Sequence, residues 1–404
     1  MRRAGAALLL ALALVPAGAA AARDKWDTKV FALVPRPGFP ALAFVAPNGR
    51  VYEGTYDNPS GDTSPSRVLE YSGDGTFLRS WPITGQDLSH PHGVQVTATD
   101  AQGRLVLLDK SPPRVLLLDT RTGTQSTYSE PFAELPTCPA GSQGDGTCSP
   151  AAQDLTPFPD YGAWGPDGSL YVTDYQQAVI WRVPPGGGKP VVWLSDRRLD
   201  GNMFGTAGIA LSADHNSLLF TQASSAGGGE LIQSTGKLYS VPIGPDGKPG
   251  MITKLWESRP TDAPDGFGIA KSGNVYIALA GPASQLVEVG PDGTERERFP
   301  TVPLTGSNGS SVPFDTPSNA SFLGTRLMVA NQSFESGDAT HQAILDVEVG
   351  EEGLPQFVPP NAGPPAPAPV AKPKPKRKPY CKHRHKHRVH HTHRTCRHRP
   401  PRRG

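Results

Sequence analysis

The sequence predicts an all-β protein, a six-bladed β-propeller made of four-stranded antiparallel blades. Between residues 26 and 352 helical periodicity is almost absent, and short alternating apolar runs recur. Gly, Pro and Asp-Gly turns separate these runs. The runs group into six similar units, and such repetition is typical of a propeller rather than a sandwich.

The N-terminal residues do not belong to these units. Residues 1–22 have the layout of a secretory signal peptide, with Arg2 and Arg3, an apolar run from Ala6 to Val15, and small residues before a cleavage point. The apolar run is too short to span a membrane. We therefore expect the mature protein to be secreted or associated with the cell envelope.

Each unit begins with a segment of two alternating apolar runs joined by a short turn. These two runs predict the first and second strands of a blade. The six segments are residues 39–56, 90–109, 158–175, 205–222, 263–279 and 316–332.

A third apolar run follows in every unit, and a fourth follows in all but the last. The third runs are residues 67–71, 114–119, 179–183, 237–241, 285–289 and 343–347. The fourth runs are residues 77–81, 124–128, 190–194, 252–256 and 295–299. An unassigned apolar segment, Lys29–Leu33, precedes the first unit, and in a closed ring it can complete the last blade and remove an unpaired edge. We expect one domain over residues 26–352.

The C-terminal part of the chain differs sharply in composition. Residues 353–380 are rich in Pro, Ala and Lys and predict an extended linker, and residues 381–404 form a basic, His-rich tail; both are expected to be disordered. Residues 371–404 hold 14 Lys or Arg and no acidic residue. The whole chain has 39 basic and 37 acidic residues, so the rest of the chain has 25 basic and 37 acidic residues and a net charge of −12.

This tail has two interpretations. As a solvated polycation it would hold the protein to an anionic cell-envelope surface. Its seven histidines between His383 and His398 could instead capture zinc, nickel or copper. Nucleic acid is not an expected partner of an exported chain, although the charge would permit it.

The four cysteines form two local pairs. Cys138 and Cys148 bracket a Gly/Ser loop, and Cys381 and Cys396 bracket the His-rich tail. In an exported protein two local disulfides are the simplest pairing, and a zinc site is the alternative for the tail pair.

Candidate functional residues precede the first strand of each unit, because in a propeller these positions surround the mouth of the central channel. Asp160, Asp265 and His92 would converge there and could hold a hard cation such as calcium. The local alternative is that both aspartates are turn residues and His92 is structural. The six aligned positions are Pro40, His92, Asp160, Ala207, Asp265 and Ser318, with Asn319 next to the last.

The units also resemble a known family, the group that contains senescence marker protein, gluconolactonase and luciferin-regenerating enzyme. The resemblance covers residues 41–331 and is clearest in P-D-G-F-G-I-A-x-x-G-N-V-Y-I-A, G-I-A-L-S-A-D-H-N-S-L-L-F-T and P-D-Y-G-A-W-G-P-D-G-S-L-Y-V-T-D. It implies a six-bladed propeller that binds a divalent metal, often calcium, at the channel mouth. The enzymes of this family hydrolyse lactones or related esters.

The resemblance also implies roles for single residues. Asp265 matches the family's metal-facing general base in its P-D-G turn, and Asp160 falls where the family usually has an asparagine ligand. The family's P-N-G turn has become Thr206-Ala207-Gly208, and the acidic residue of the first blade falls at Pro40. Two of the four expected ligands are therefore missing.

Two functions of different classes remain open. The first is a lactone or ester hydrolase in which Asp265, Asp160 and His92 hold the metal and Asp265 or His92 activates water. The second is a monomeric, non-catalytic propeller similar to the NHL-repeat type, which binds a carbohydrate or protein at its mouth. The segment R-L-V-L-L-D-K-S-P-P-R-V-L-L-L-D also resembles royal jelly and yellow-type propellers.

Overall fold

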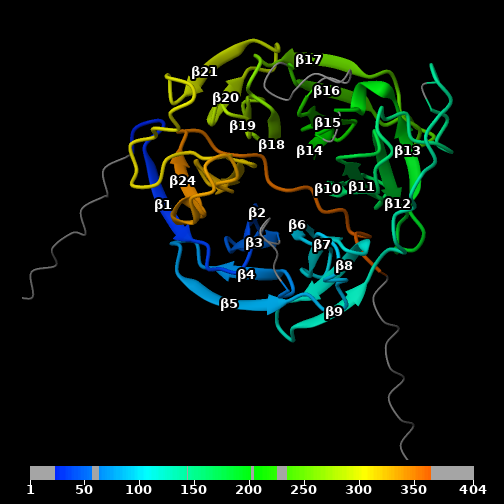
Figure 1. Ribbon diagram of the computed structural model, residues 1–404, viewed down its shortest axis with the longest axis horizontal. Helices are drawn as coiled ribbons and strands as arrows, with labels where there is room; N and C mark the ends of the chain where they lie inside the picture. The colour runs from blue at the N-terminus through cyan, green and yellow to red at the C-terminus, as the bar shows by residue number, and fades with distance from the viewer. Residues whose placement is uncertain (1–22, 57–62, 143, 202–203, 225–233, 365–404) are drawn as a thin grey trace, which may run out of the picture. The chain divides into compact units, whose positions relative to one another are not determined.

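Six sheets surround a central channel in the computed structural model (Figure 1), as the repeats predict. The structure describes residues 23–56, 63–142, 144–201, 204–224 and 234–364. The predicted signal peptide and residues 365–404 of the predicted linker and tail lie outside these ranges. The predicted all-β, six-bladed propeller of four-stranded antiparallel blades is confirmed.

The first strand of each blade lies at the channel, and the other strands follow outward. Blades 1 to 3 contain β2 (Phe39–Val45), β3 (Val51–Tyr56), β4 (Arg67–Tyr71) and β5 (Phe77–Pro82); β6 (Val94–Thr99), β7 (Leu105–Lys110), β8 (Pro113–Asp119) and β9 (Thr124–Thr127); and β10 (Pro159–Trp164), β11 (Leu170–Asp174), β12 (Val179–Val183) and β13 (Val191–Ser195). Blades 4 to 6 contain β14 (Thr206–Leu211), β15 (Ser217–Gln222), β16 (Lys237–Pro242) and β17 (Thr253–Glu257); β18 (Pro264–Ile269), β19 (Val275–Leu279), β20 (Gln285–Val289) and β21 (Glu295–Phe299); and β22 (Ser321–Leu323), β23 (Arg326–Asn331), β24 (Ala343–Glu348) and β1 (Thr28–Leu33). Two 3₁₀ turns, Arg197–Leu199 and Ala339–His341, lie in loops.

The N-terminal strand closes the ring. β1 pairs antiparallel with β24, from Thr28 opposite Val347 to Leu33 opposite Ala343. This confirms that the segment Lys29–Leu33 supplies the outer strand that the last blade lacks. The pairing joins the two ends of the propeller and leaves β24 without an open edge.

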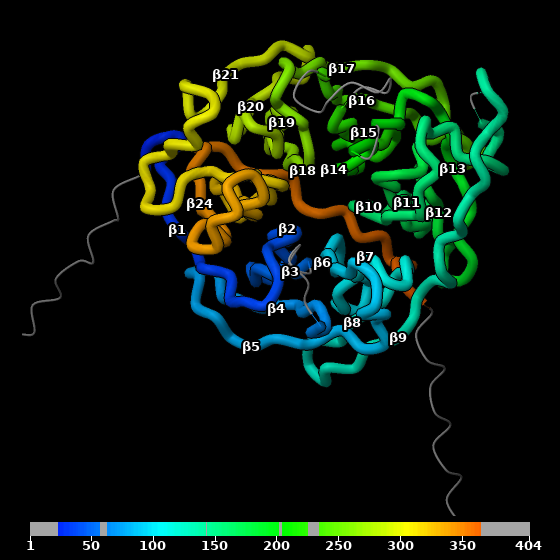
Figure 2. Tube along the Cα trace, in the orientation of Figure 1, coloured from blue at the N-terminus to red at the C-terminus, as the bar shows by residue number. Residues whose placement is uncertain are grey.

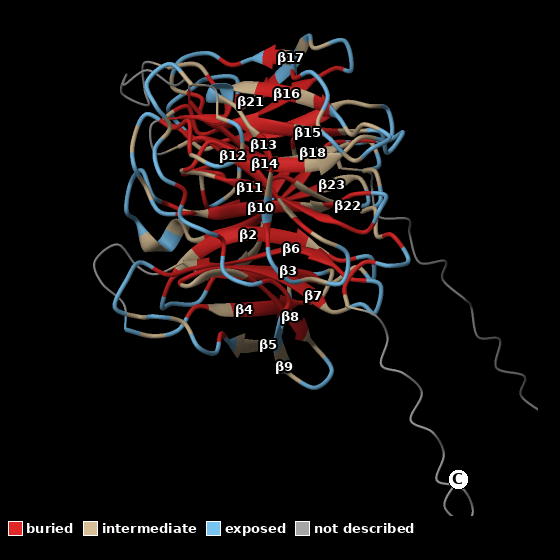
Figure 3. Cartoon of the chain, turned by 90° about the vertical axis from the view of Figure 1, so that its right-hand side faces the viewer, coloured by how far each residue is buried: buried red, intermediate tan, exposed pale blue. Residues whose placement is uncertain are grey.

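Neighbouring blades are held together by apolar side chains on both faces of each sheet. Leu238 and Trp256 of blade 4, for example, pack with Ile277 and Val287 of blade 5. Figure 3 shows the consequence, since the strands are mostly buried and the exposed residues gather in the loops. Each blade therefore depends on its neighbours for burial, as in other repeat folds.

Four inner strands share an irregularity near their start. In blades 1, 3, 4 and 5 the register with the second strand shifts across two residues, which form a bulge. A bulge leaves its residues outside the regular ladder and redirects their side chains. The bulge residues are Ala41 and Leu42, Asp160 and Tyr161, Ala207 and Gly208, and Asp265 and Gly266.

The predicted disulfide Cys138–Cys148 is present, with the two Cα atoms 4.9 Å apart. It closes a ten-residue separation in the loop between β9 and β10. Cys381 and Cys396 lie outside the described residues. Among the residues that the structure describes, no helix is long and apolar enough to cross a membrane.

Residues 353–364 differ from the predicted disordered linker. This segment, here called the strap, crosses the ring (Figure 2) and is held at both ends. The Leu354 amide donates to Ile269 O of blade 5 (2.8 Å), and Asn361 Nδ2 donates to Asp167 O of blade 3 (2.8 Å). Phe357 and Val358 pack against the core of blades 2 and 3. The Pro-rich composition of this segment predicts disorder, but its few apolar side chains are partly buried at one end of the channel.

Ring closure gives a stability prediction. We expect Val30→Asp to lower the free energy of unfolding by about 1–3 kcal/mol, because Val30 is half-buried against the core of blades 5 and 6. Lys29→Asp introduces an aspartate at the neighbouring position, where the side chain is exposed, and should change the free energy of unfolding far less. Urea denaturation of both variants measures this; equal losses would contradict the role of Val30 in closure.

Candidate functional site

Asp160 and Asp265 lie at equivalent bulge positions, at the mouth of the channel. They are 6% and 8% exposed. Neither is in a turn before a strand, since both are the second residue of their inner strands, β10 and β18. The two aspartates are therefore brought together from different blades, as the alignment of the units predicts.

The backbone of Asp265 is fixed by both neighbouring blades. Thr221 Oγ1 of blade 4 donates to Asp265 O at 2.7 Å, and the Gly266 amide donates to Ser318 O of blade 6 at 2.7 Å. A Cβ atom on Gly266 would lie 2.5 Å from Tyr161 Oη, so this position requires glycine. These contacts set the place of the carboxyl group before any ligand arrives.

The first blade needs a correction. The alignment of the units placed Pro40 opposite Asp160, but Pro40 pairs with Thr55 as Pro159 pairs with Asp174. The residue that matches Asp160 is therefore Ala41, one position later. Its methyl group cannot bind a cation either, so the missing ligand of this blade remains missing.

A buried lysine lies beside the aspartates. Lys110, the last residue of β7, has a side chain that is 1% exposed. Its Nζ donates to Gln95 Oε1 and to Pro159 O, and it lies 3.5 Å from Asp160 Oδ1. The rings of Phe158 and Tyr56 lie 4.5 and 5.5 Å from this nitrogen. Oxygen atoms and aromatic faces thus surround a positive charge that belongs to the chain itself.

The two carboxyl groups influence one another. Burial, and then the charge of Asp160, raise the pKa of Asp265 well above its ordinary value. Burial also raises the pKa of Asp160, but the Lys110 ammonium opposes this effect. Burial lowers the pKa of Lys110 to about 8 in spite of its acidic neighbours. Asp160 is thus the better placed of the two to stay ionised, and Asp265 to hold a proton.

Tyr161 divides the channel. From its position after Asp160 it reaches across the ring, and its hydroxyl donates to Ser318 O of blade 6 at 2.7 Å. The charges of Asp265 and Asp160 add to burial in raising the pKa values of Tyr161, Tyr56 and Tyr175. The mouth therefore combines two carboxyl groups, one ammonium group and three phenols in a small volume.

His92 does not join this group. It is 2% exposed, and its two ring nitrogens lie 2.9 Å from Ser64 O and 3.3 Å from His90 O. Both nitrogens thus face backbone carbonyls, as expected of a structural histidine. The catalytic role predicted for His92 has no support in these contacts.

The described residues do not fit a divalent cation at the mouth. A calcium ion would require several free oxygen ligands, but Asp160, Gln95 and Pro159 O already face the Lys110 ammonium. Within the described part of the chain, no three His, Cys, Asp or Glu side chains are grouped to hold a metal. The positive charge beside Asp160 is thus the Lys110 ammonium group of the chain itself.

Sequence reasoning missed Lys110 and the tyrosines because it compared only the starts of the first strands. In an antiparallel hairpin the end of the second strand lies at the same mouth. The end positions of the second strands, aligned in the same way, would have revealed a lysine and two tyrosines. They are Tyr56, Lys110, Tyr175, Ala223, Ala280 and Gln332.

Sequence reasoning also missed Glu53 on β3, which carries another buried carboxyl group. Its Oε1 accepts hydrogen bonds from the amides of Ala41 and Leu42 at 2.8 Å, and its Oε2 has no partner among the described residues. Burial raises the pKa of Glu53 to about 8. Because the bulge of blade 1 rests on this side chain, we assign Glu53 a structural role.

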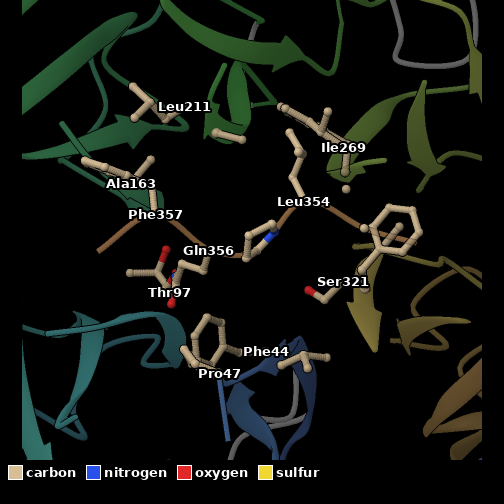
Figure 4. A pocket seen from close by; sticks show the side chains of 18 of the residues that line it. Phe44, Pro47, Thr97, Ala163, Leu211, Ile269, Ser321, Leu354, Gln356 and Phe357 are labelled. Atoms are coloured by element: carbon tan, nitrogen blue, oxygen red, sulfur yellow. The ribbon is translucent and has the colours of Figure 1, made fainter. Parts of the chain in front are cut away.

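A cavity of about 780 Å³ occupies the opposite end of the channel, beyond Tyr161. Figure 4 shows Leu354, Gln356 and Phe357 of the strap passing between Phe44 and Ile269. The lining is largely apolar, and its Lys271 and Glu352 are paired with each other at the surface. This end holds the cavity, whereas Asp160, Asp265 and Lys110, whose pKa values are shifted, lie at the mouth.

The misfit between the mouth and a divalent metal can be tested directly. We expect calcium or a chelator to leave the melting temperature unchanged, because the Lys110 ammonium already neutralises Asp160. Lys110→Ala removes this ammonium group and should make the protein calcium-stabilised. Calcium is suited to the test because it prefers oxygen over the imidazoles of the tail. A calcium-dependent melting temperature in the unmodified protein would contradict this interpretation.

Glu53 predicts a pH dependence of stability. The folded protein keeps this proton up to about pH 8, whereas the unfolded chain releases it near 4.5. The folded state therefore binds more protons between these values, and the free energy of unfolding falls as pH rises, by on the order of 5 kcal/mol at most. Glu53→Gln should flatten this fall in urea denaturation across the range, while the exposed Glu335→Gln should not.

Comparisons with solved structures agree with the propeller fold. A candidate gluconolactonase from structural genomics is similar at 16% identity and a TM-score of 0.52, over 84% of this chain and 95% of that one. A luciferin-regenerating enzyme is similar at 12% identity and a TM-score of 0.50, over 80% of this chain and 95% of that one. A PQQ-bound aldose sugar dehydrogenase from Streptomyces coelicolor is similar at 16% identity and a TM-score of 0.51, over 80% of this chain and 97% of that one.

No protein-family profile and no curated protein matches the sequence. The structural likeness therefore concerns the fold, and at these identities it does not extend to activity. The chain is a six-bladed β-propeller of the fold found in gluconolactonase-like proteins and the luciferin-regenerating enzyme.

Proposed function

We propose that this protein hydrolyses a small lactone or ester at the channel mouth, with Asp160 and Asp265 as an acid–base pair and without a divalent metal. The reaction class follows from the sequence resemblance of residues 41–331 to the gluconolactonase group. We expect the reaction to take place outside the cytoplasm, because residues 1–22 have the layout of a signal peptide. The group of perturbed ionisable residues at the mouth supports the site.

The observation on which the proposal rests is the state of Asp265. Its Oδ1 is buried and has no hydrogen-bond partner among the described residues. A buried polar atom without a partner is costly, and a native protein keeps one chiefly where a ligand or a reaction uses it. Asp160 and Lys110 are close enough to influence the pKa of this carboxyl group.

The arrangement suits hydrolysis by two carboxyl groups with different tasks. Asp160, ionised beside Lys110, takes a proton from water while the water oxygen bonds to the carbonyl carbon. Asp265, protonated, gives its proton to the departing alkoxide as the bond from the carbonyl carbon to that oxygen breaks. Transfer of a proton from Asp160 to Asp265 through water then restores both groups. Lys110 keeps the pair from holding two protons.

Removal of either carboxyl group should slow the reaction strongly. We expect Asp265→Asn and Asp160→Asn each to lower kcat by about 10²–10⁴-fold, because each removes one proton-transfer step. A panel of lactones and esters, followed by continuous titration of the acid released, measures this. Asp292→Asn, in an exposed turn of the same blade as Asp265, is the matched control and should keep full activity.

The pH profile provides a second measurement. Since Asp265 acts in its protonated form and its pKa is raised, activity should extend above the pH at which an ordinary aspartate ionises and fall as pH rises through that raised pKa. In Asp265→Asn, the decrease of activity at high pH should be absent. If no lactone or ester is hydrolysed, or if both Asn variants keep the wild-type rate, the hydrolase proposal is wrong and a non-catalytic binding propeller becomes the better interpretation.

A further inference from the structure

Aromatic side chains form a continuous series around the channel mouth. We call this series the aromatic arc, and each ring lies close to the next. The centroid separations are 6.3 Å from Phe334 to Phe39, 5.4 Å from Phe39 to Tyr56, 6.1 Å from Tyr56 to Phe158, 6.2 Å from Phe158 to Tyr175, and 5.7 Å from Tyr175 to Phe204.

The arc is built from the mouth ends of three blades and one loop. Phe39 begins β2, and Tyr56 ends β3 opposite it. Phe158 and Tyr175 flank the first hairpin of blade 3, where the Tyr175 amide donates to Phe158 O at 2.9 Å. Phe204 precedes β14. The six rings therefore follow one side of the same opening.

These rings are not part of the buried core. Phe334 is 58% exposed, and the other five members of the arc are partly exposed. Large aromatic residues between the blades, such as Trp164 and Tyr171, are by contrast almost fully buried. A contiguous, accessible apolar surface of this kind usually marks a ligand or partner site.

The arc surrounds the proposed catalytic groups. Lys110 Nζ lies against the rings of Phe158 and Tyr56, at 4.5 and 5.5 Å. The charges of Asp160 and Asp265 act on both Tyr56 and Tyr175, so the carboxyl groups lie near the middle of the arc. A substrate held on the rings would thus present its reacting bond to the acid–base pair.

The polar groups beneath the arc limit what can bind. A polyhydroxylated sugar needs several free donors and acceptors. Lys110 is already bonded to Gln95, Pro159 O and Asp160, and Tyr161 to Ser318 O. Asp265 Oδ1 and Gln222 Oε1, at the mouth end of β15, are buried atoms without a partner in the described chain, and the arc itself carries the phenols of Tyr56 and Tyr175. The site therefore offers few polar contacts beside a wide apolar surface.

We propose that the aromatic arc selects substrates with a flat, apolar ring, that is, aryl lactones or aryl esters, over sugar lactones. This inference rests on the proposed hydrolase function for its reaction, but the binding part does not require catalysis. Stacking against successive rings supplies the affinity, and the single carbonyl or leaving oxygen meets Asp265.

The experiment compares dihydrocoumarin with glucono-1,5-lactone as substrates. We expect the wild-type protein to have the higher kcat/KM for dihydrocoumarin. Phe39→Ala and Phe158→Ala, on either side of Tyr56 in the middle of the arc, should each raise KM for dihydrocoumarin about 3- to 10-fold with little change in kcat. Phe77→Ala removes an exposed ring from the outer strand of blade 1 and is the control, with KM unchanged.

Binding of 2-naphthol, measured by calorimetry, separates the inference from the hydrolase proposal. Binding that Phe39→Ala and Phe158→Ala weaken and Phe77→Ala does not would support the arc, even if no ester is hydrolysed and the proposed activity is wrong. Absence of naphthol binding, equal effects of all three substitutions, or preference for glucono-1,5-lactone would overturn the inference. Thermal melts of each variant establish that the comparison concerns folded protein.

Discussion

The pairing of β1 with β24 is the constraint on which the rest of the molecule depends. It joins the first and last parts of the described chain, so the six inner strands are held in a closed circle. Only in that circle do groups from separate blades meet, such as Lys110 of blade 2, Asp160 of blade 3 and Asp265 of blade 5. The N-terminal strand contributes no side chain to the mouth, yet the mouth cannot form without it.

Closure also brings a difficult combination of charges into a buried place. Two ionised carboxyl groups in a low-dielectric environment repel one another, and burial costs each of them its hydration. The positive charge of Lys110 offsets this repulsion, and its ammonium group contacts a carbonyl, an amide oxygen and two aromatic rings. The carboxyl group of Asp265 keeps one oxygen, Oδ1, without a hydrogen-bond partner, and this group gives the mouth its chemical character.

Much of the fold could be predicted because every blade repeats the same alternation, which determines strands, turns and even the closing strand. The positions of Asp160 and Asp265 followed from this repeat. The register of blade 1 did not, because Ala41 follows Phe39-Pro40 as Asp160 follows Phe158-Pro159, so that the equivalent residue is Ala41 and not Pro40. Lys110 was missed because its strand end meets Asp160 only in three dimensions, and the strap was missed because proline masked its few apolar residues. The calcium prediction was made from the converging mouth residues and from the family resemblance, and neither takes into account the end of the second strand, where Lys110 lies.

The bulges in the inner strands have a wider consequence. The first residue of each bulge stands outside the regular ladder, so a change of its side chain removes no ladder pairing. Ala41, Asp160, Ala207 and Asp265 therefore form a set of equivalent positions at which side chains of different chemistry fit the same strand geometry. A propeller of this kind can gain, lose or exchange reactive groups by single substitutions, and its activity can drift far while its architecture stays constant.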